Sequence, residues 1–196
     1  MSGAFGMKVG NESQAGGFLI PGRDALFTHG QRKLVINALN EAEEHTAGYY
    51  CIPPRQWQQL PYDLITRNDR EWDPLPETAL ARVQRLERLN TGRLGPLEFF
   101  RIQLNDPKVL SVASREKLEP DIYSFLVYIL THEMVHMIRL SKILDSACMP
   151  ASAQMEESEE YRVDRISRQI LSRIDGDRFR AIFRKMPDAL RVNAVF

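Results

Sequence analysis

The chain has 196 residues, which is enough for one domain with a proper hydrophobic core. Its 26 basic and 26 acidic residues balance, so there is no overall electrostatic case for binding nucleic acid. The 2 cysteines give no disulfide framework and form no CxxC pair, which excludes a zinc-ribbon module. Because we find neither a secretion signal nor an apolar run long enough to span a bilayer, we expect a cytoplasmic protein with no membrane segment.

The first part of the chain is predicted to contain a flexible tail that is followed by a helix. Residues 1–22 are rich in glycine and have little periodicity, which is typical of a mobile tail. Thr28 can cap a helix that covers residues 31–45. Residues 49–52 (Tyr-Tyr-Cys-Ile) predict a strand that two prolines end. Residues 53–75, with two tryptophans and several prolines, predict an irregular connection whose aromatic side chains pack.

The middle of the chain is predicted to contain one helix and a small sheet. Apolar residues recur every third position from Leu80 onward, which predicts a helix over residues 76–90. Its arginines are interpreted as a solvated face. Residues 97–104 alternate in polarity and predict a strand. Residues 109–113 predict a second short strand directly before the next helix.

Two long helices are predicted in the last third of the chain. Residues 122–144 carry a continuous apolar stripe at helical spacing. Residues 152–174 carry a second stripe, and Asp175 and Gly176 are expected to end that helix. A last short helix follows. Many arginines occur in this third of the chain, and we interpret them as the solvent-exposed faces of its helices rather than as a DNA-binding site.

A His-Glu-x-x-His motif lies in the first of these helices, at His132, Glu133 and His136. Because the histidines are four residues apart, both can bind one Zn²⁺ ion from the same helical face. The Glu133 carboxylate lies beside the metal, where it can take a proton from a water molecule as a general base. The motif predicts a zinc peptidase. The alternative is a pair of core histidines, which would need hydrogen-bond partners.

A catalytic zinc ion usually has three protein ligands, so a third ligand is needed. No histidine follows His136, which leaves Cys148 or a carboxylate. Glu156, Glu159 and Glu160 lie on or close to the apolar face of the second long helix, where buried charge needs a partner such as a metal ion. Alternatively, these acids complement the positive end of the helix dipole. The acidic segment is the preferred source of the ligand.

The motif followed by a glutamate on a later helix resembles the gluzincin class of zinc metallopeptidases. Residues 160–167 resemble the Glu-x-x-small-Asn/Asp-x-Phe-Ala signature of ImmA/IrrE-type peptidases, although the small residue and the Phe-Ala pair are missing. The resemblance implies that Glu160 is the third ligand and that Asp164 hydrogen-bonds a ligating histidine from the second shell. Glu156 is the alternative ligand, because the number of residues between it and His136 matches the spacing in thermolysin-like enzymes. We prefer Glu160.

The resemblance also implies a fold. It covers residues 120–175 and predicts an α+β, zincin-like fold that is mostly helical, with a small mixed sheet beside the motif helix. Residues 23–196 would form a single metallopeptidase domain. One edge strand of the sheet would bind the substrate backbone as an added strand.

The activity expected from these features is zinc-dependent hydrolysis of peptide bonds in an intracellular protein or peptide substrate. Zn²⁺ is the expected cofactor, Glu133 is the expected base, and no nucleic-acid or membrane partner is expected. Tyr161, Tyr123 and Arg139 remain open as donors to the oxyanion. One alternative is a catalytically silent zincin-fold protein with a regulatory or binding role. Another is a helical adaptor in which the motif occurs by chance.

Overall fold

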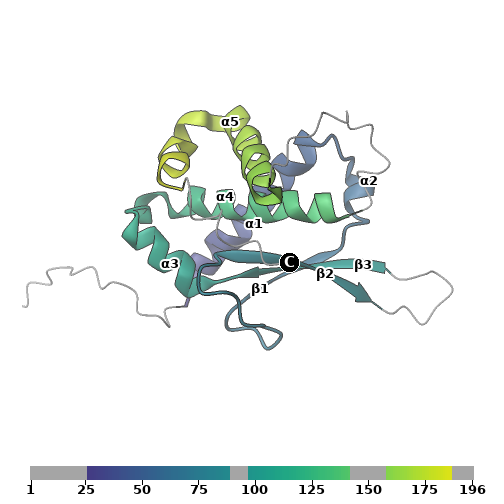
Figure 1. Ribbon diagram of the computed structural model, residues 1–196, viewed down its shortest axis with the longest axis horizontal. Coiled ribbons are helices and arrows are strands. Elements are labelled where there is room, and N and C mark those ends of the chain that lie inside the picture. Colours follow the sequence, from purple (N-terminus) through teal and green to yellow (C-terminus); the bar gives the residue numbers. More distant parts are fainter. Residues whose placement is uncertain (1–25, 89–96, 142–157, 187–196) are drawn as a thin grey trace, which may run out of the picture.

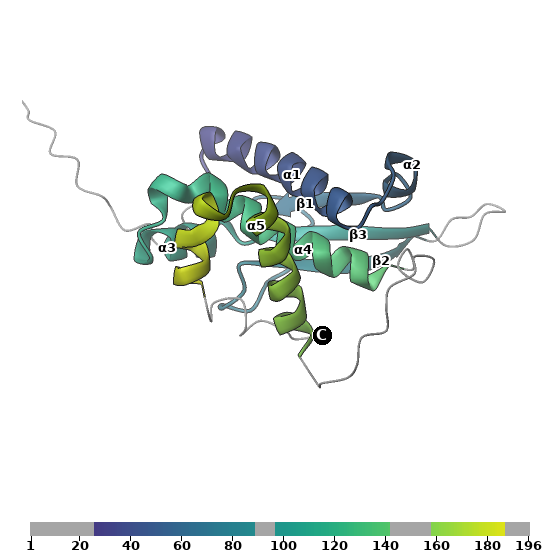
Figure 2. The same cartoon turned by 90° about the horizontal axis from the view of Figure 1, so that it is seen from above.

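A long buried helix, α4 (Ile122–Leu140), lies beside a three-stranded sheet in the computed structural model. Figures 1 and 2 show α1 (His29–Tyr49) and α5 (Glu159–Lys185) on the same side of the sheet as α4. This arrangement confirms the predicted mixed α+β class. The structure describes three stretches of the chain: residues 26–88, 97–141 and 158–186. The predicted tail, residues 1–22, lies outside them.

Helix α1 confirms the predicted cap and extends beyond the predicted end. The Thr28 hydroxyl accepts a hydrogen bond from the backbone N–H of Gln31, whose side chain accepts one from the Thr28 N–H in return. The buried stripe then continues at spacings of three and four up to Thr46, so the helix ends only at Tyr49. The strand predicted over residues 49–52 is therefore wrong.

The sheet contains β1 (Tyr62–Thr66), β2 (Ala81–Arg88) and β3 (Leu97–Leu104) in the order β1-β3-β2. Strand β1 is parallel to β3 and β2 is antiparallel to it, so the sheet is mixed. The strand predicted over residues 97–104 is confirmed as β3. Strand β2 is at one edge of the sheet and packs against α4.

The helix predicted over residues 76–90 is wrong, because these residues pair with β3. Ala81 and Val83 lie opposite Leu104 and Ile102, so they share the sheet face that carries the buried side chains of β3. Apolar residues at every third position favoured a helix, but in a strand such residues point alternately to the two faces of the sheet. The region predicted to be irregular contains β1 and a short helix, α2 (Pro54–Trp57), whose tryptophan is buried as expected.

The second strand predicted before the motif helix is also wrong. Residues 109–113 belong to α3 (Asp106–Arg115), where Val109, Val112 and Ala113 are buried at helical spacing. The buried Asp106 carboxylate accepts hydrogen bonds from the backbone N–H groups of Phe27 and Arg67, so it fixes the start of α3. A short 3₁₀ turn, η1 (Glu119–Asp121), leads into α4.

Helix α4 is buried on all sides and α5 packs across it. Every residue from Ser124 to Ile138 is buried, because α4 lies between the sheet and the two outer helices. Helix α5 bends at Asp175, which divides it into the second long helix and the last short helix that were predicted. The predicted start of α5 at residue 152 lies outside the described residues. None of the helices in the described stretches is long and apolar enough to cross a bilayer.

The part of α5 after the bend is attached to α1 and α4 by one arginine. The Arg178 guanidinium donates to the Glu41 carboxylate of α1 at 2.6 Å and to the Ser124 hydroxyl of α4 at 2.9 Å. The guanidinium also lies over two aromatic rings, 5.1 Å from the centre of the Tyr123 ring and 4.8 Å from that of Phe179. A cation above the face of an aromatic ring is attracted to it. These contacts hold the C-terminal part of α5 against the start of α4.

Two adjacent phenylalanines of β3 test the orientation of the sheet. Phe100 is fully buried on the helix-facing side, whereas Phe99 points to the other face and is half-buried. We expect Phe100→Ala to lower the free energy of unfolding by about 3–5 kcal/mol through the cavity that it leaves. Phe99→Ala is the matched control with a smaller loss. Urea unfolding followed by circular dichroism measures both, and equal losses would contradict the register.

Candidate metal centre

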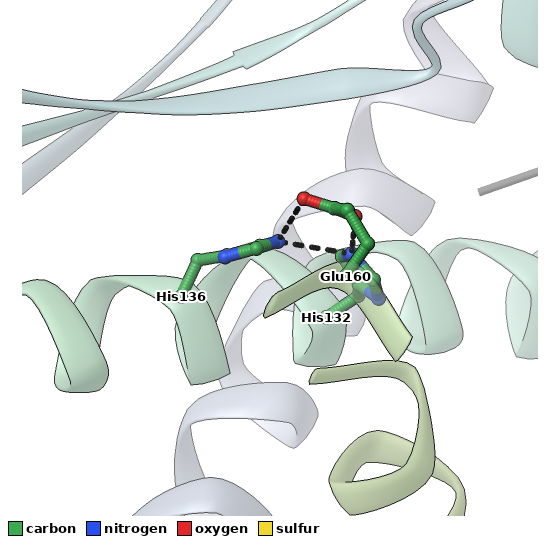
Figure 3. Close-up of side chains that lie close together, drawn as sticks. All are labelled: His132, His136 and Glu160. Atoms are coloured by element: carbon green, nitrogen blue, oxygen red, sulfur yellow. Dashed lines mark hydrogen bonds and ion pairs between the residues drawn. The ribbon is translucent and has the colours of Figure 1, made fainter. Parts of the chain in front are cut away.

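Helix α4 brings two imidazoles together in a buried position. His132 and His136 are one turn apart, so both side chains leave the same face of the helix (Figure 3). Their Nε2 atoms are 3.2 Å apart, and the exposed fractions of the two residues are 2% and 8%. Only one of two facing nitrogens can donate a hydrogen to the other, so this contact does not by itself satisfy both rings.

Glu160, in the first turn of α5, completes a cluster with these histidines. Its Oε1 atom is 3.1 Å from Nε2 of His136, and its Oε2 atom is 3.3 Å from Nε2 of His132 (Figure 3). Ser158 precedes the helix, and its hydroxyl accepts a hydrogen bond from the Tyr161 N–H. Because Ser158 caps the helix, α5 begins just before Glu160, and its first turn lies against the histidines of α4.

The separations in this cluster fit a bound metal ion. Metal bonds of about 2.0–2.1 Å in tetrahedral geometry place the ligand atoms about 3.3 Å from one another. The three separations observed between the histidine and carboxylate atoms are 3.1, 3.2 and 3.3 Å. His132, His136 and Glu160 can therefore hold one metal ion, and they are the residues preferred from the sequence.

Carboxylates around the two histidines determine the electrostatics of the cluster. Although burial alone would raise the pKa of Glu160, hydrogen bonds from both histidines lower that pKa to about 2. Burial alone would lower the pKa of His136, but Glu160 and the charges of Glu133 and Glu159 raise it. Burial raises the pKa of Glu133, and the histidines only partly oppose this. A divalent cation would neutralise the negative charge gathered here.

Glu133 lies between the motif helix and the edge strand of the sheet. It is 5% exposed, and the backbone of Val83 in β2 is hydrogen-bonded to its carboxylate. Its carboxylate is not among the three groups that could hold a metal ion, and its position beside a metal stays a prediction of the motif. The role of Val83 was missed because residues 76–90 were interpreted as a helix. The alternation of Ala81, Val83 and their polar neighbours was the available signal.

A second buried contact sets the position of α5 on α4. The hydroxyl of Tyr128 donates to Oδ1 of Asp164 at 2.5 Å. Tyr128 is one turn before His132, and Asp164 is one turn after Glu160. The bond therefore joins the two helices next to the metal cluster, and the matching one-turn spacings were the signal that could have revealed Tyr128.

The position of Asp164 differs from the prediction. Its carboxylate accepts from Tyr128 and from the Arg168 guanidinium at 2.9 Å, and not from a histidine. Within the described part of the chain, Nδ1 of His132 is buried without a hydrogen-bond partner. Asp164 therefore positions the helix that carries Glu160, and the direct bond expected from it to a histidine of the motif is absent from this part of the chain.

Arg168 extends this contact to the end of α5. Its guanidinium donates to the carbonyl oxygens of Phe183 at 2.9 Å and Met186 at 3.1 Å, which are at the C-terminal end of the helix. The same guanidinium lies over the Phe183 ring at 5.1 Å. One arginine thus connects the Asp164 contact with the part of α5 that follows the bend.

The three candidate oxyanion donors occupy different places. Arg139 forms a paired ion bridge with Glu159, at 2.5 and 2.9 Å, which attaches the first turn of α5 to the end of α4. Tyr123 is about 13 Å from His132 along α4, since each residue adds about 1.5 Å, and its hydroxyl donates to Glu41. Tyr161 is exposed on α5. In the described part of the chain, none of the three forms a hydrogen bond with His132, His136 or Glu160.

A tyrosine that the sequence did not indicate lies near the Arg139–Glu159 pair. Tyr50, at the end of α1, has a buried hydroxyl without a hydrogen-bond partner among the described residues. Burial raises its pKa to about 12, and the charges of Arg139 and Glu159 act on it in opposite directions. Tyr50 is therefore a neutral hydrogen-bond donor at neutral pH. It was missed because its segment was predicted to be a strand.

Two sequence candidates fall outside the described residues: Glu156, the alternative third ligand, and Cys148. The cluster is accordingly described with Glu160 alone as its carboxylate ligand. Comparisons with protein-family models, curated proteins and solved structures found no match.

Metal binding can be tested directly on the three ligating residues. We expect protein purified without chelators to hold about one metal ion per chain, since the cluster offers three ligands, and His136→Ala to lose it. His29→Ala, which changes an exposed histidine, is the control. Removing the metal with EDTA should lower stability by about 2.7 kcal/mol if the free metal was at 100 times its Kd. Elemental analysis and thermal unfolding measure these effects, and equal metal in all three proteins would rule out the cluster.

Tyr128→Phe tests whether the contact with Asp164 positions Glu160. Loss of the hydroxyl should lower the free energy of unfolding by about 1.5–3 kcal/mol, as for hydrogen bonds to charged groups, and should also weaken metal binding. Tyr62→Phe is the matched control, because its hydroxyl donates to Glu43 at the same 2.5 Å away from the cluster. Competition with a chromogenic chelator measures the metal Kd. Equal Kd values in both variants would show that the Tyr128 bond is only structural.

Proposed function

We propose that this chain is a zinc-dependent peptidase of the gluzincin class, with a zincin-like fold and a resemblance to ImmA/IrrE-type enzymes. The observation that carries the proposal is the convergence of His132, His136 and Glu160 at tetrahedral separations. Two imidazoles and one carboxylate are a ligand set of catalytic zinc sites, which keep a fourth position open. A purely structural zinc site usually has four protein ligands, and the described residues offer three.

The chemistry divides between the metal and the motif glutamate. When bound, zinc supplies a Lewis acid that polarises the scissile carbonyl and lowers the pKa of a water molecule toward about 7. Glu133 takes the proton from that water and delivers it to the leaving amine. The burial of Glu133 and its hydrogen bond with the Val83 backbone orient the carboxylate and limit its contact with solvent.

The edge strand β2 supports a peptide as substrate. An edge strand has unpaired backbone groups on one side, and an extended peptide can pair with them as an added strand. The hydrogen bond between Val83 and Glu133 brings the proposed base to this strand. A substrate backbone aligned along β2 would therefore pass the base and the metal together. We propose an intracellular protein or peptide as this substrate.

Glu133→Gln separates catalysis from metal binding. The amide keeps the size of the side chain but cannot act as a base, so hydrolysis should fall by roughly 10²–10⁴-fold while the metal content is unchanged. Glu44→Gln, on the exposed side of α1, is the control with wild-type activity. Mass spectrometry of a mixed peptide library measures cleavage.

The outcomes of this experiment distinguish the alternatives. Cleavage by Glu133→Gln at the wild-type rate would remove Glu133 as the base. A wild-type protein that holds zinc and cleaves no peptide in the library would point to a catalytically silent protein with a regulatory role. A protein that folds normally with chelator present and takes up no metal would make the motif a coincidence.

A further inference from the structure

The last part of α5, residues 176–186, is a short helical segment that turns away from the rest of the helix. Asp175 has a φ of −156° and a ψ of 87°, which are not helical, and its carboxylate accepts a hydrogen bond from the Arg178 N–H at 3.0 Å. Asp175 therefore ends the first part of the helix and caps the second. Figure 1 shows α5 folding back at this bend, so that its last part lies over the start of α4. We call residues 176–186 the terminal segment.

Both ends of the terminal segment are attached to other parts of the molecule. Its first turn is fixed by the Arg178 guanidinium, which is bonded to α1 and α4. Its last turn presents the carbonyl oxygens of Phe183 and Met186, and both accept hydrogen bonds from Arg168 in the first part of α5. Between these two places, Phe179 is fully buried. The terminal segment is therefore a separate unit whose position depends on two arginines.

Arg168 is the point at which the terminal segment meets the contact between α4 and α5. Its Nη1 and Nη2 atoms donate to the terminal segment, and its Nε atom donates to the two oxygens of Asp164 at 3.0 and 2.9 Å. Asp164 in turn accepts from the Tyr128 hydroxyl of α4. A guanidinium has a rigid, planar arrangement of donors, so a shift of its partners on one side changes the bonds on the other. The position of the terminal segment therefore influences the Tyr128–Asp164 bond.

The Tyr128–Asp164 bond is about one helical turn from the metal cluster on both helices. Tyr128 is four residues before His132, and Asp164 is four residues after Glu160. A change in this bond would shift α5 on α4, and with it the 3.1 and 3.3 Å separations between Glu160 and the two histidines. Metal affinity is sensitive to such changes, since loss of the groups that orient metal ligands typically costs about 10–100-fold.

The other attachment beside the cluster does not involve the terminal segment. The ion pair of Arg139 and Glu159 holds the first turn of α5 on the end of α4. This pair lies before Glu160 in the helix, whereas Asp164 lies after it. When the terminal segment is released, the pair still holds the start of α5. We therefore expect weaker metal binding after release, and not the loss of the cluster.

We propose that the terminal segment is a latch that sets the affinity of the cluster for its metal ion. While the latch is attached, it holds Arg168 and Asp164 so that Glu160 lies opposite the two histidines. When the latch is released, the metal binds less tightly. The inference rests on the metal cluster of the proposed function and is independent of peptide cleavage. An event at the end of α5 would thus regulate a ligand that lies about 12 Å from Arg168 along the helix, at about 1.5 Å per residue.

A change at the far end of the latch tests this coupling without altering the cluster. Arg178→Gln removes the side-chain bonds of the latch to α1 and α4, whereas Arg168, Asp164 and Tyr128 remain. We expect the Kd for zinc, measured on the full-length chain by competition with a chromogenic chelator, to rise roughly tenfold. Arg178→Lys keeps the charge but loses the paired geometry. It is the milder variant if Arg178→Gln fails to fold, which circular dichroism reports.

Arg101→Gln is the matched control for the change at Arg178. Arg101 also forms a paired bridge with one carboxylate, that of Asp63, and its side chain is 20% exposed compared with 27% for Arg178. It belongs to β3, away from α5. The control should keep the wild-type Kd for zinc. A wild-type Kd in both Arg178 variants, or an equal rise in the control, would overturn the latch.

Hydrogen exchange gives a second measurement that a merely structural role would not change. Because coupling between two sites is reciprocal, a bound metal ion should strengthen the attachment of the latch. The amide hydrogens of residues 176–186 should therefore exchange more slowly in the zinc-loaded chain. The comparison is made at labelling times at which β3 stays protected in both forms, so that it reports local release and not global unfolding. Equal exchange of this segment with and without zinc would contradict the latch.

The outcomes separate this proposal from the peptidase function. A zinc-loaded chain that shows both effects and cleaves no peptide would support the latch and contradict the peptidase function. Peptide cleavage by the wild type, together with an unchanged Kd in the Arg178 variants, would overturn the latch alone. A chain that takes up no zinc would overturn both.

Discussion

The contact between α4 and α5 is the interaction on which the candidate site depends. His132 and His136 share one rigid helix, so their separation is set as soon as that helix forms. Glu160 belongs to a different helix, and only the packing of α5 brings it within 3.3 Å of both imidazoles. The Tyr128–Asp164 bond and the Arg139–Glu159 ion pair hold α5 on either side of this point. The geometry of the cluster is therefore a result of helix packing.

Polar groups are concentrated in the most buried helix of the molecule. Helix α4 has apolar side chains over most of its surface, which accounts for its place between the sheet and two helices. Its histidines, Glu133 and Tyr128 are exceptions, and each has a partner on α5 or β2. In the described part of the chain, Nδ1 of His132 and the hydroxyl of Thr131 are the buried polar atoms of α4 without a hydrogen-bond partner. Burial of ionisable groups is costly without such partners. This grouping of polar side chains indicates a functional position more clearly than the motif alone.

Local patterns predicted the long helices and strand β3, but not β1, β2 or α3. The stripes of α1, α4 and α5 repeat over many turns, and the spacing placed His132 and His136 together with several glutamates of α5. The resemblance to a family signature then selected Glu160 among these glutamates. Strand β2 was taken for a helix because its apolar residues recur every third position, whereas its conformation is determined by pairing with β3. Tyr50, Tyr128 and Val83 were missed because their roles depend on neighbours in distant segments, and the spacing within one segment gives only a partial signal of such neighbours.

The division of the cluster between two helices has a consequence for the topology of the chain. An ion held by both helices would join positions 28 residues apart and close the loop between them in the folded chain. Unlike a disulfide, an ion that leaves on unfolding stabilises the fold through mass action and does not constrain the unfolded chain. The ion would then hold the two helices together as well as take part in the proposed catalysis, and its loss would loosen α5 before any other helix.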